Sequence, residues 1–313
     1  MTDASATPST FKKWLVATRP WALPASTMPV IFGTSLAVVI GGAKLDPWRF
    51  LLALLTMMVL HSAANMLSDV FDYRRGLDTA VTPVSGAVVR RWLTANQVAT
   101  GAIVLFLAGI AAGLWLAALT GTILLVIGAV GVAVGAGYTL LKYHALGDLA
   151  VFLDFGILGG LGAWVVQTGT FSWIPVLWTV PMAMLVIGIL HANNWRDIVS
   201  DSDRRVRTFA SILGDKGSEA YYAFLIFGSM AIIFGLMLIP RLWPPLIPMP
   251  WTFVVVLIAL PKALSLWGRA KRRRAPRQPM DFVILDGATA NYNLVFGLLC
   301  TAAVWLRFVL MLN

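Results

Sequence analysis

Hydrophobic residues fill most of the chain in long runs that short polar segments separate. Nine of these runs approach the 20 or so apolar residues that a helix needs to cross a bilayer. The predicted spans are 21–40, 50–70, 98–117, 121–141, 149–166, 174–195, 220–239, 251–267 and 290–308. Short strands with alternating apolar and polar residues are not evident, which disfavours a membrane β-barrel. We therefore expect an all-α polytopic membrane protein with about nine transmembrane helices around a central cavity.

The composition supports this interpretation. Of the 313 residues, 59% are hydrophobic and only 12% are charged, whereas a soluble domain carries about 25% charged residues. Cys300 is the only cysteine, so no disulfide can form within the chain. These numbers exclude a soluble globular enzyme, a disordered chain and a disulfide-stabilised scaffold.

Basic residues are distributed unevenly between the two sides that the spans create. Of the 24 Lys and Arg residues, only Lys44, Arg49, Arg241 and Arg307 fall on one side. The others share a side with the N-terminus and lie at 12–19, 74–91, 142, 196–216 and 262–277. Lys and Arg accumulate in cytoplasmic loops, which predicts a cytoplasmic N-terminus and an external C-terminus.

The same distribution explains the net charge of +10. The basic run at 271–274 precedes the last span, where such runs orient the chain and attract anionic lipids. We therefore predict a bilayer with anionic lipids as a partner, and no nucleic acid.

Acidic residues are scarce, and six of the 14 lie in two short windows, 69–78 and 197–203. Both windows fall at the cytoplasmic end of a predicted span. On a helix, residues three or four positions apart share a face. The first shared face is formed by Asn65, Asp69 and Asp72, with His61 deeper in the membrane. The second is formed by Asn194, Asp197 and Asp201, with His191 deeper.

Carboxylates at a membrane boundary repel one another and are costly to desolvate. Oxygen ligands at this density suit Mg²⁺, which is commonly completed by water and substrate phosphates. Pairing with nearby arginines would explain one such cluster, but two on the same side favour a shared site. For His61 and His191, buried hydrogen-bonded residues and substrate-contacting residues are both open.

The two windows resemble the aspartate-rich motifs of UbiA-type intramembrane aromatic prenyltransferases. The first motif of that family, approximately Asn-Asp-x-x-Asp, corresponds to residues 68–72, and the second, Asp-x-x-x-Asp, to residues 197–201. Segments 18–26, 193–214 and 289–299 are similar to the 1,4-dihydroxy-2-naphthoate branch of menaquinone biosynthesis. Ser68 replaces the asparagine of the first motif, and Asn65 lies one turn earlier. Thr82 stands where an arginine is usual, and Arg90 or Arg91 lies nearby.

The resemblance implies transfer of a polyprenyl group from a prenyl diphosphate to an aromatic acceptor, giving a demethylmenaquinone-type precursor. It implies two Mg²⁺ ions that bridge the diphosphate. The implied metal ligands are Asp69, Asp72, Asp197, Asp201 and Asn65. These four aspartates are also implied in catalysis, together with Lys142 and Tyr138. The expected substrate-binding residues are Asn65, Ser68, Asn194, Arg196, Arg207, Tyr73, His61 and His191.

We expect one domain over residues 1–313, with a polar N-terminal tail at 1–18 and cytoplasmic cap loops at 73–97 and 202–219. A bacterial plasma membrane, with the site facing the cytoplasm, is the expected location. The acceptor could instead be 4-hydroxybenzoate, a porphyrin or a glycerol phosphate. An ion-coupled secondary transporter would place its acids near the midplane of the bilayer. A phospholipid head-group transferase would need one dense motif, which residues 69–86 do not supply.

Overall fold

The computed structural model describes residues 8–77, 81, 86–203, 206–242, 247–272 and 279–312, and no β-strand occurs within these ranges. The predicted all-α membrane fold is confirmed. In chain order the helices are α1 (Thr10–Ala17), η1 (Pro20–Ala22), α2 (Pro24–Val39), α3 (Pro47–Arg74), α4 (Ala95–Thr120), α5 (Thr122–Tyr143), α6 (Gly147–Val151), η2 (Phe152–Leu158), α7 (Gly159–Thr168), α8 (Trp173–Trp178), α9 (Val180–Arg196), α10 (Ile198–Asp203), α11 (Phe209–Leu242), η3 (Trp251–Ala259), α12 (Leu260–Lys271) and α13 (Pro279–Leu312).

In the described part of the chain, seven helices are long and apolar enough to span a membrane, or eight with one bent pair. Each of the nine predicted spans is helical, and the counts differ chiefly at 174–195. There the chain forms two helices, α8 of 6 residues and α9 of 17 residues, separated at Thr179. Pro181 lies in the first turn of α9 and has no N–H group with which to continue the hydrogen bonds of α8. The helix predicted over 174–195 is therefore interrupted at Thr179.

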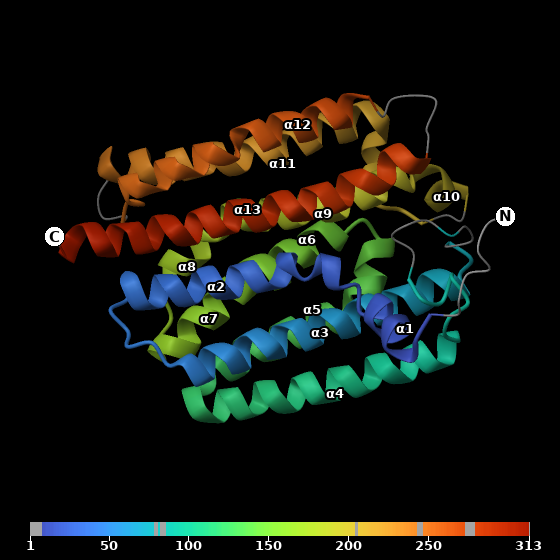
Figure 1. Cartoon of the computed structure of the whole chain (residues 1–313), viewed down its shortest axis with the longest axis horizontal. Helices are drawn as coiled ribbons and strands as arrows, with labels where there is room; N and C mark the ends of the chain where they lie inside the picture. The colour runs from blue at the N-terminus through green and yellow to red at the C-terminus, as the bar shows by residue number, and fades with distance from the viewer. Residues whose placement is uncertain are drawn as a thin grey trace.

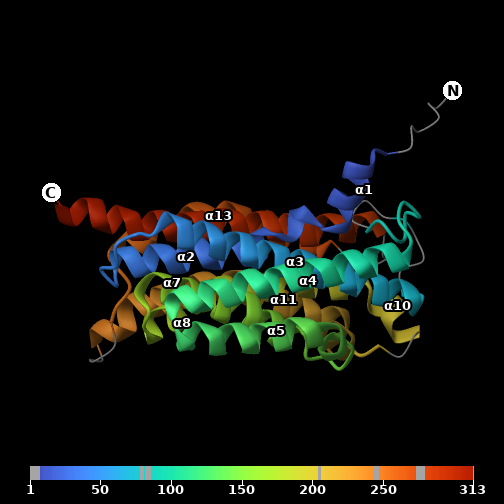
Figure 2. The ribbon, with the colours of Figure 1, turned by 90° about the horizontal axis from the view of Figure 1, so that it is seen from below.

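The long helices lie side by side and roughly parallel or antiparallel (Figure 1). Within the bundle α3 packs on α4, α9 packs on α11 and α13, and α2 packs on α7 and α13. Helices α1 and α10 lie at one end of the bundle, and α13 ends at the other (Figures 1 and 2). Since α3 and α9 both end near α10, the two aspartate-rich windows lie at the same end of the bundle.

A buried aromatic cluster joins α2, α8 and η3. The ring of Phe253 meets Phe32 at 6.2 Å and Trp178 at 6.0 Å, both edge to face. Close to this cluster α2 approaches α7 so tightly that a Cβ atom on Gly33 would overlap the backbone carbonyl of Gly160. Glycine at position 33 permits this contact, since any larger residue would push the two helices apart.

The chain bends by 57° between the α1–η1 segment and α2. Arg19 lies before this bend, between α1 and η1, with φ 50° and ψ 59°, the left-handed region that is costly for a residue with a Cβ atom. Helix α1 begins after Ser9, whose hydroxyl caps it, and its last residue, Ala17, packs with Met66 and Val70. Residues 10–17 of the expected N-terminal tail are therefore helical and pack on α3 through Ala17.

The expected cap loops contain ordered structure where they are described. Ala87 and Val88 are buried against Met66 and Val70, which places the start of the 86–93 turn under α3. The second expected cap loop, 202–219, is shorter than predicted, because helix α11 begins at Phe209. Residues 78–80, 82–85 and 204–205 lie outside the described ranges, and they include Asp78 of the first acidic window and Thr82, which replaces the usual arginine. Lys262, which was expected in a loop, belongs to α12 and contacts the side chain of Asn291 on α13.

Candidate active site

The carboxylate of Asp69 lies fully buried on the last turns of α3. Nη2 of Arg19 donates a 2.7 Å hydrogen bond to Oδ1 of Asp69. The other oxygen, Oδ2, is buried without a hydrogen-bond partner in the described structure. The backbone at Gly86 covers this carboxylate so closely that a Cβ atom there would overlap it. Asp69 is thus enclosed by the side chain of Arg19 and by the loop that precedes α4.

Asp72, one turn further along α3, is held by α5. Nζ of Lys142 donates to Oδ2 of Asp72 at 3.1 Å, and the hydroxyl of Tyr143 donates to Oδ1 at 2.8 Å. The hydroxyl of Ser68 donates a longer bond of 3.4 Å to Oδ2. The guanidinium of Arg75 lies 4.3 Å from the centre of the Tyr143 ring. The predicted face of α3 therefore exists, and basic groups from η1 and α5 meet it.

The second cluster differs from the predicted continuous helix face. Helix α9 ends at Arg196, Asp197 is its C-cap, and the short helix α10 begins at Ile198. The N–H of Asp201 still donates to the carbonyl of Asp197 at 2.8 Å, so the chain continues to turn. Asn194 and Asp201 are buried, and Oδ1 of Asn194 has no hydrogen-bond partner within the described structure.

Arg196 joins the second cluster to α13. Its Nε and Nη2 donate to the two carboxylate oxygens of Asp197 at 2.9 and 2.8 Å. Its Nη1 donates to Oδ2 of Asp286 at 3.0 Å, and Nδ2 of Asn193 donates to the same oxygen at 3.4 Å. Asp286 was not predicted from the sequence. A lone acidic residue near the start of the last span was the available signal.

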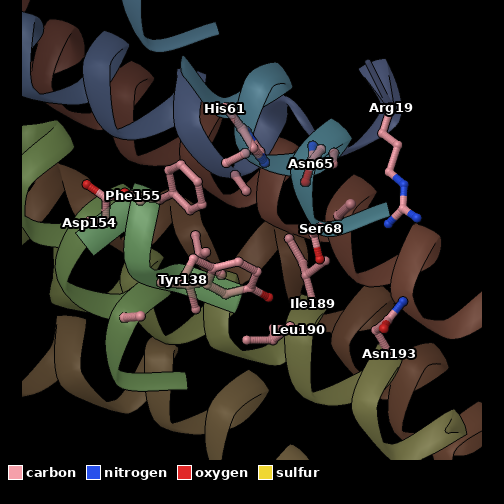
Figure 3. Close-up of a pocket in the computed structure, with 18 of the residues that line it drawn as sticks. Arg19, His61, Asn65, Ser68, Tyr138, Asp154, Phe155, Ile189, Leu190 and Asn193 are labelled. Carbon is pink, nitrogen blue, oxygen red and sulfur yellow. The ribbon is translucent and has the colours of Figure 1, made fainter. Parts of the chain in front are cut away.

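A cavity of about 140 Å³ lies between these clusters. Five predicted residues line it, namely His61, Asn65, Ser68, Tyr138 and Lys142. Figure 3 shows these side chains, except Lys142, with Arg19 and Asn193 at one end and Asp154 and Phe155 at the other. Arg19, Asn193, Asp154 and Asp286 are lining residues that sequence reasoning did not assign to the site. The motif aspartates lie behind this lining, while Arg19 and Lys142, which pair with two of them, reach the cavity.

The two histidines have different surroundings. His61 lines the cavity, with Nδ1 2.8 Å from the hydroxyl of Ser26 and its ring centre 4.3 Å from that of Phe155. His191 is buried outside the lining, with Nδ1 3.9 Å from a carboxylate oxygen of Asp148 and its ring edge-on to Tyr221 at 4.8 Å. Of the two roles left open by the sequence, the position of His191 favours the buried one.

Two further predicted residues lie away from the cavity lining. Tyr73 is 41% exposed, so its ring does not shield the cavity. The side chain of Arg207 is exposed, although its N–H group bonds to the carbonyl of Tyr143 at 3.4 Å. In the described structure, no three His, Cys, Asp or Glu side chains are gathered closely enough to hold a metal ion by themselves.

Comparison with known proteins identifies the family of the chain. Residues 26–295 match the model of the UbiA prenyltransferase family. The chain belongs to this family. It is therefore a prenyltransferase, as the resemblance of its motifs implied, and the predicted enzyme class is confirmed.

Relatives in this family extend over almost the whole chain. The 1,4-dihydroxy-2-naphthoate octaprenyltransferase of Mycobacterium tuberculosis is 33% identical over 86% of this chain and 90% of its own length. The enzyme of the same name from Bacillus subtilis is 29% identical over 93% of this chain and 91% of its own. A UbiA prenyltransferase domain-containing protein 1 homolog from Drosophila melanogaster is 31% identical over 97% and 83%.

Solved structures of UbiA homologs share the fold. The apo structure from Aeropyrum pernix K1 has a TM-score of 0.65 at 15% identity and covers 91% of this chain and 98% of that one. A homolog from Archaeoglobus fulgidus, bound to DMAPP and Mg²⁺, has a TM-score of 0.59 at 13% identity, with the same two coverages. These similarities show that the chain has the same fold as the solved UbiA homologs.

Proposed function

We propose that this prenyltransferase moves a polyprenyl group from a polyprenyl diphosphate to 1,4-dihydroxy-2-naphthoate and that the reaction requires Mg²⁺. The observation that carries the proposal is the convergence of three aspartate–base pairs, described above, at one end of the bundle. Carboxylates attract divalent cations, and the adjacent Arg and Lys groups attract phosphate oxygens. The acceptor is supported by the names of the mycobacterial and Bacillus relatives.

The donor set fits Mg²⁺. Oδ2 of Asp69 and Oδ1 of Asn194 are buried oxygen atoms without a hydrogen-bond partner in the described structure, which is costly unless a ligand satisfies them. Each cluster alone is an incomplete site, as expected for ions that complete their coordination with substrate phosphate. The residues that would hold two ions are Asp69, Asp72, Asp197, Asp201 and Asn65. Bound Mg²⁺ would neutralise negative charge on the departing diphosphate.

The side chains in and beside the cavity have separate roles in the proposed reaction. Arg19, Lys142 and Arg196 donate hydrogen bonds to diphosphate oxygens and so favour departure of the diphosphate. The bond between the allylic carbon and oxygen breaks, and its electron pair leaves with the diphosphate. A ring carbon of the acceptor forms the new carbon–carbon bond and loses its proton, and the carboxylate of the naphthoate leaves as CO₂ and is replaced by a proton. Tyr138 presents its ring to the allylic cation, and the apolar walls exclude water that would capture it.

The proposed location is a bacterial plasma membrane, with the site facing the cytoplasm. Most basic residues lie at the end of the bundle that carries the aspartates, which is the pattern of a cytoplasmic face. Anionic lipid headgroups would contact the same basic end. A diphosphate headgroup would then reach the site from the aqueous side, while its hydrocarbon tail stays within the bilayer.

A panel of acceptors tests this function. Purified protein in liposomes receives radiolabelled polyprenyl diphosphate and one acceptor, either 1,4-dihydroxy-2-naphthoate or 4-hydroxybenzoate. We expect labelled product with the naphthoate and at least about tenfold less with the benzoate, because a pocket shaped for two fused rings binds a smaller ring less well. Product with 4-hydroxybenzoate and none with the naphthoate would support prenyl transfer to an aromatic ring but contradict the proposed acceptor.

A further inference from the structure

Asp154 is an acidic residue within a membrane span, and the reaction described above does not use it. It belongs to η2, a π-helical stretch of seven residues between α6 and α7. π-Helical turns are rare, and they frequently occur at functional sites. An ionisable side chain inside the bilayer is costly, so its position calls for a partner or a ligand.

The carboxylate of Asp154 faces α5 at two glycines. A Cβ atom on Gly131 would lie 3.0 Å from Oδ1, and a Cβ atom on Gly135 would lie 3.4 Å from Oδ2. Asp154 is partly buried, and no hydrogen bond or ion pair joins its carboxylate to another described residue. The two glycines thus leave room for the carboxylate, but α5 gives it no polar partner.

Asp154 lies where two cavities meet. It lines the polar cavity that also contains Lys142, and it lines a second cavity of about 550 Å³ that is bounded by α3, α4, α5 and α7. Ala64, Gly135 and Phe155 are shared by both linings. In the second cavity the hydroxyl of Thr56 is also buried without a hydrogen-bond partner in the described structure. The other side chains there are apolar.

The residues around Asp154 indicate which kind of ligand can bind beside it. A metal ion would need more ligands than one carboxylate, and in the described structure Asp154 belongs to no group of three His, Cys, Asp or Glu side chains that could hold one. A hydrocarbon chain would leave the carboxylate without a hydrogen-bond donor. A flat apolar ring that carries a hydroxyl group can pack against the apolar walls and donate a hydrogen bond to the carboxylate of Asp154. Aromatic surfaces are available at this junction, since Phe155 stacks on His61 and Tyr138 lies in the same lining.

We propose that Asp154 binds a ring hydroxyl of the aromatic acceptor and thereby selects acceptors that carry one. The proposal rests on the proposed function, because it concerns the second substrate of the same site. In it, the ring lies at the junction of the two cavities, with one edge toward the diphosphate and a hydroxyl toward Asp154. The carboxylate acts as a specificity-determining group that touches the substrate.

Binding of 1-naphthol, measured by quenching of tryptophan fluorescence in detergent, tests the contact without turnover. We expect wild-type protein to bind 1-naphthol about tenfold more tightly than 1-methoxynaphthalene, which cannot donate a hydrogen bond. Asp154→Leu should remove this difference, while Asp154→Asn should retain part of it. Equal affinities of the wild-type protein for the two ligands would overturn the proposal, even if the Leu variant failed to fold.

Turnover provides the second measurement. Asp154→Leu should raise the KM of the acceptor about tenfold and leave the KM of the polyprenyl diphosphate unchanged. Gly131→Ala, which crowds Oδ1 of Asp154, should raise the same KM, whereas Gly137→Ala is a matched control whose added methyl meets nothing within 4 Å. An unchanged acceptor KM in both test variants would overturn the role of Asp154. Selective naphthol binding without transfer to any aromatic would instead overturn the proposed function.

Discussion

Arg19, which lies between α1 and η1, donates a 2.7 Å hydrogen bond to Asp69, fifty positions later on α3. The left-handed backbone of Arg19 sets the direction of this contact. The pair joins the N-terminal segment to the first aspartate-rich motif. It also leaves Oδ2 of Asp69 free of protein hydrogen bonds within the described structure. One carboxylate thus meets a cation of the protein on one side and can meet Mg²⁺ on the other.

Replacing Asp69 should abolish most of the activity. We expect Asp69→Asn to lower kcat/KM at least about 100-fold, since a neutral amide neither attracts Mg²⁺ nor pairs fully with Arg19. Steady-state turnover in detergent measures this change. Asp46→Asn, at the opposite end of α3, is a matched control that should retain near wild-type turnover. Equal activity in the two variants would contradict the role of Asp69.

Arg19 should act mainly on the diphosphate substrate. Arg19→Ala should raise the KM of the polyprenyl diphosphate about tenfold or more, because a charge-assisted hydrogen bond to phosphate is lost. Arg19→Lys should recover only part of the effect, since lysine lacks the planar fork of arginine. Initial rates are measured at varied concentrations of each substrate, with the other substrate saturating. They give the KM of the diphosphate and the KM of the acceptor. A change confined to the acceptor KM would be inconsistent with this assignment.

The two partners of Asp72 should differ in importance. Tyr143→Phe removes one neutral donor and should lower the free energy of unfolding by about 1 kcal/mol. Lys142→Met leaves a buried carboxylate without its cation, so the loss should reach about 3 kcal/mol. Thermal unfolding in detergent compares them, and turnover should fall further in the Lys142 variant. Larger losses from Tyr143→Phe than from Lys142→Met would reverse this ranking.

Asp286 should act through Arg196 as a positioning residue. We expect Asp286→Asn to lower kcat/KM about tenfold, chiefly through the diphosphate KM, because Arg196 loses the anion that directs one of its amino groups. Asp286→Glu should restore part of the activity. A variant that lost stability without any change in either KM would indicate that Asp286 is merely structural.

The contact between α2 and α7 should tolerate no side chain. Gly33→Ala should reduce the free energy of unfolding by about 1–3 kcal/mol, since its methyl group overlaps the backbone at Gly160. Gly268→Ala adds the same methyl group where nothing lies within 4 Å. Chemical denaturation in detergent compares the two, and equal midpoints would contradict the close packing.

The first motif could be predicted from the sequence because it lies on one continuous helix. The spacing of Asn65, Asp69 and Asp72 translates directly into a face of α3. In the second motif the helix ends at Arg196, so the same rule predicts a continuous face that the structure interrupts at Asp197. No proline or glycine between 194 and 201 marks this end.

Contacts between distant segments were beyond sequence reasoning. Arg19 was read only as a basic residue near the N-terminus, and its pairing with Asp69 depends on a left-handed residue that the sequence does not reveal. Asp286 and Asp154 are single acids in apolar runs, and their significance emerges once helices from other parts of the chain surround them. Apolar periodicity predicts the spans well, whereas the polar lining of the cavity depends on tertiary packing.

The decisive measurement is one turnover assay with polyprenyl diphosphate and 1,4-dihydroxy-2-naphthoate, in which diphosphate and prenylated product are quantified together. The assay is run with Mg²⁺ and with EDTA, on the wild-type protein and on the double variant Asp69→Ala, Asp197→Ala. We predict equimolar diphosphate and prenylated naphthoquinol with Mg²⁺ in the wild type, and neither product with EDTA or in a double variant that remains folded. Equal consumption with and without Mg²⁺, or full activity of the double variant, would contradict a reaction centred on the two aspartate clusters.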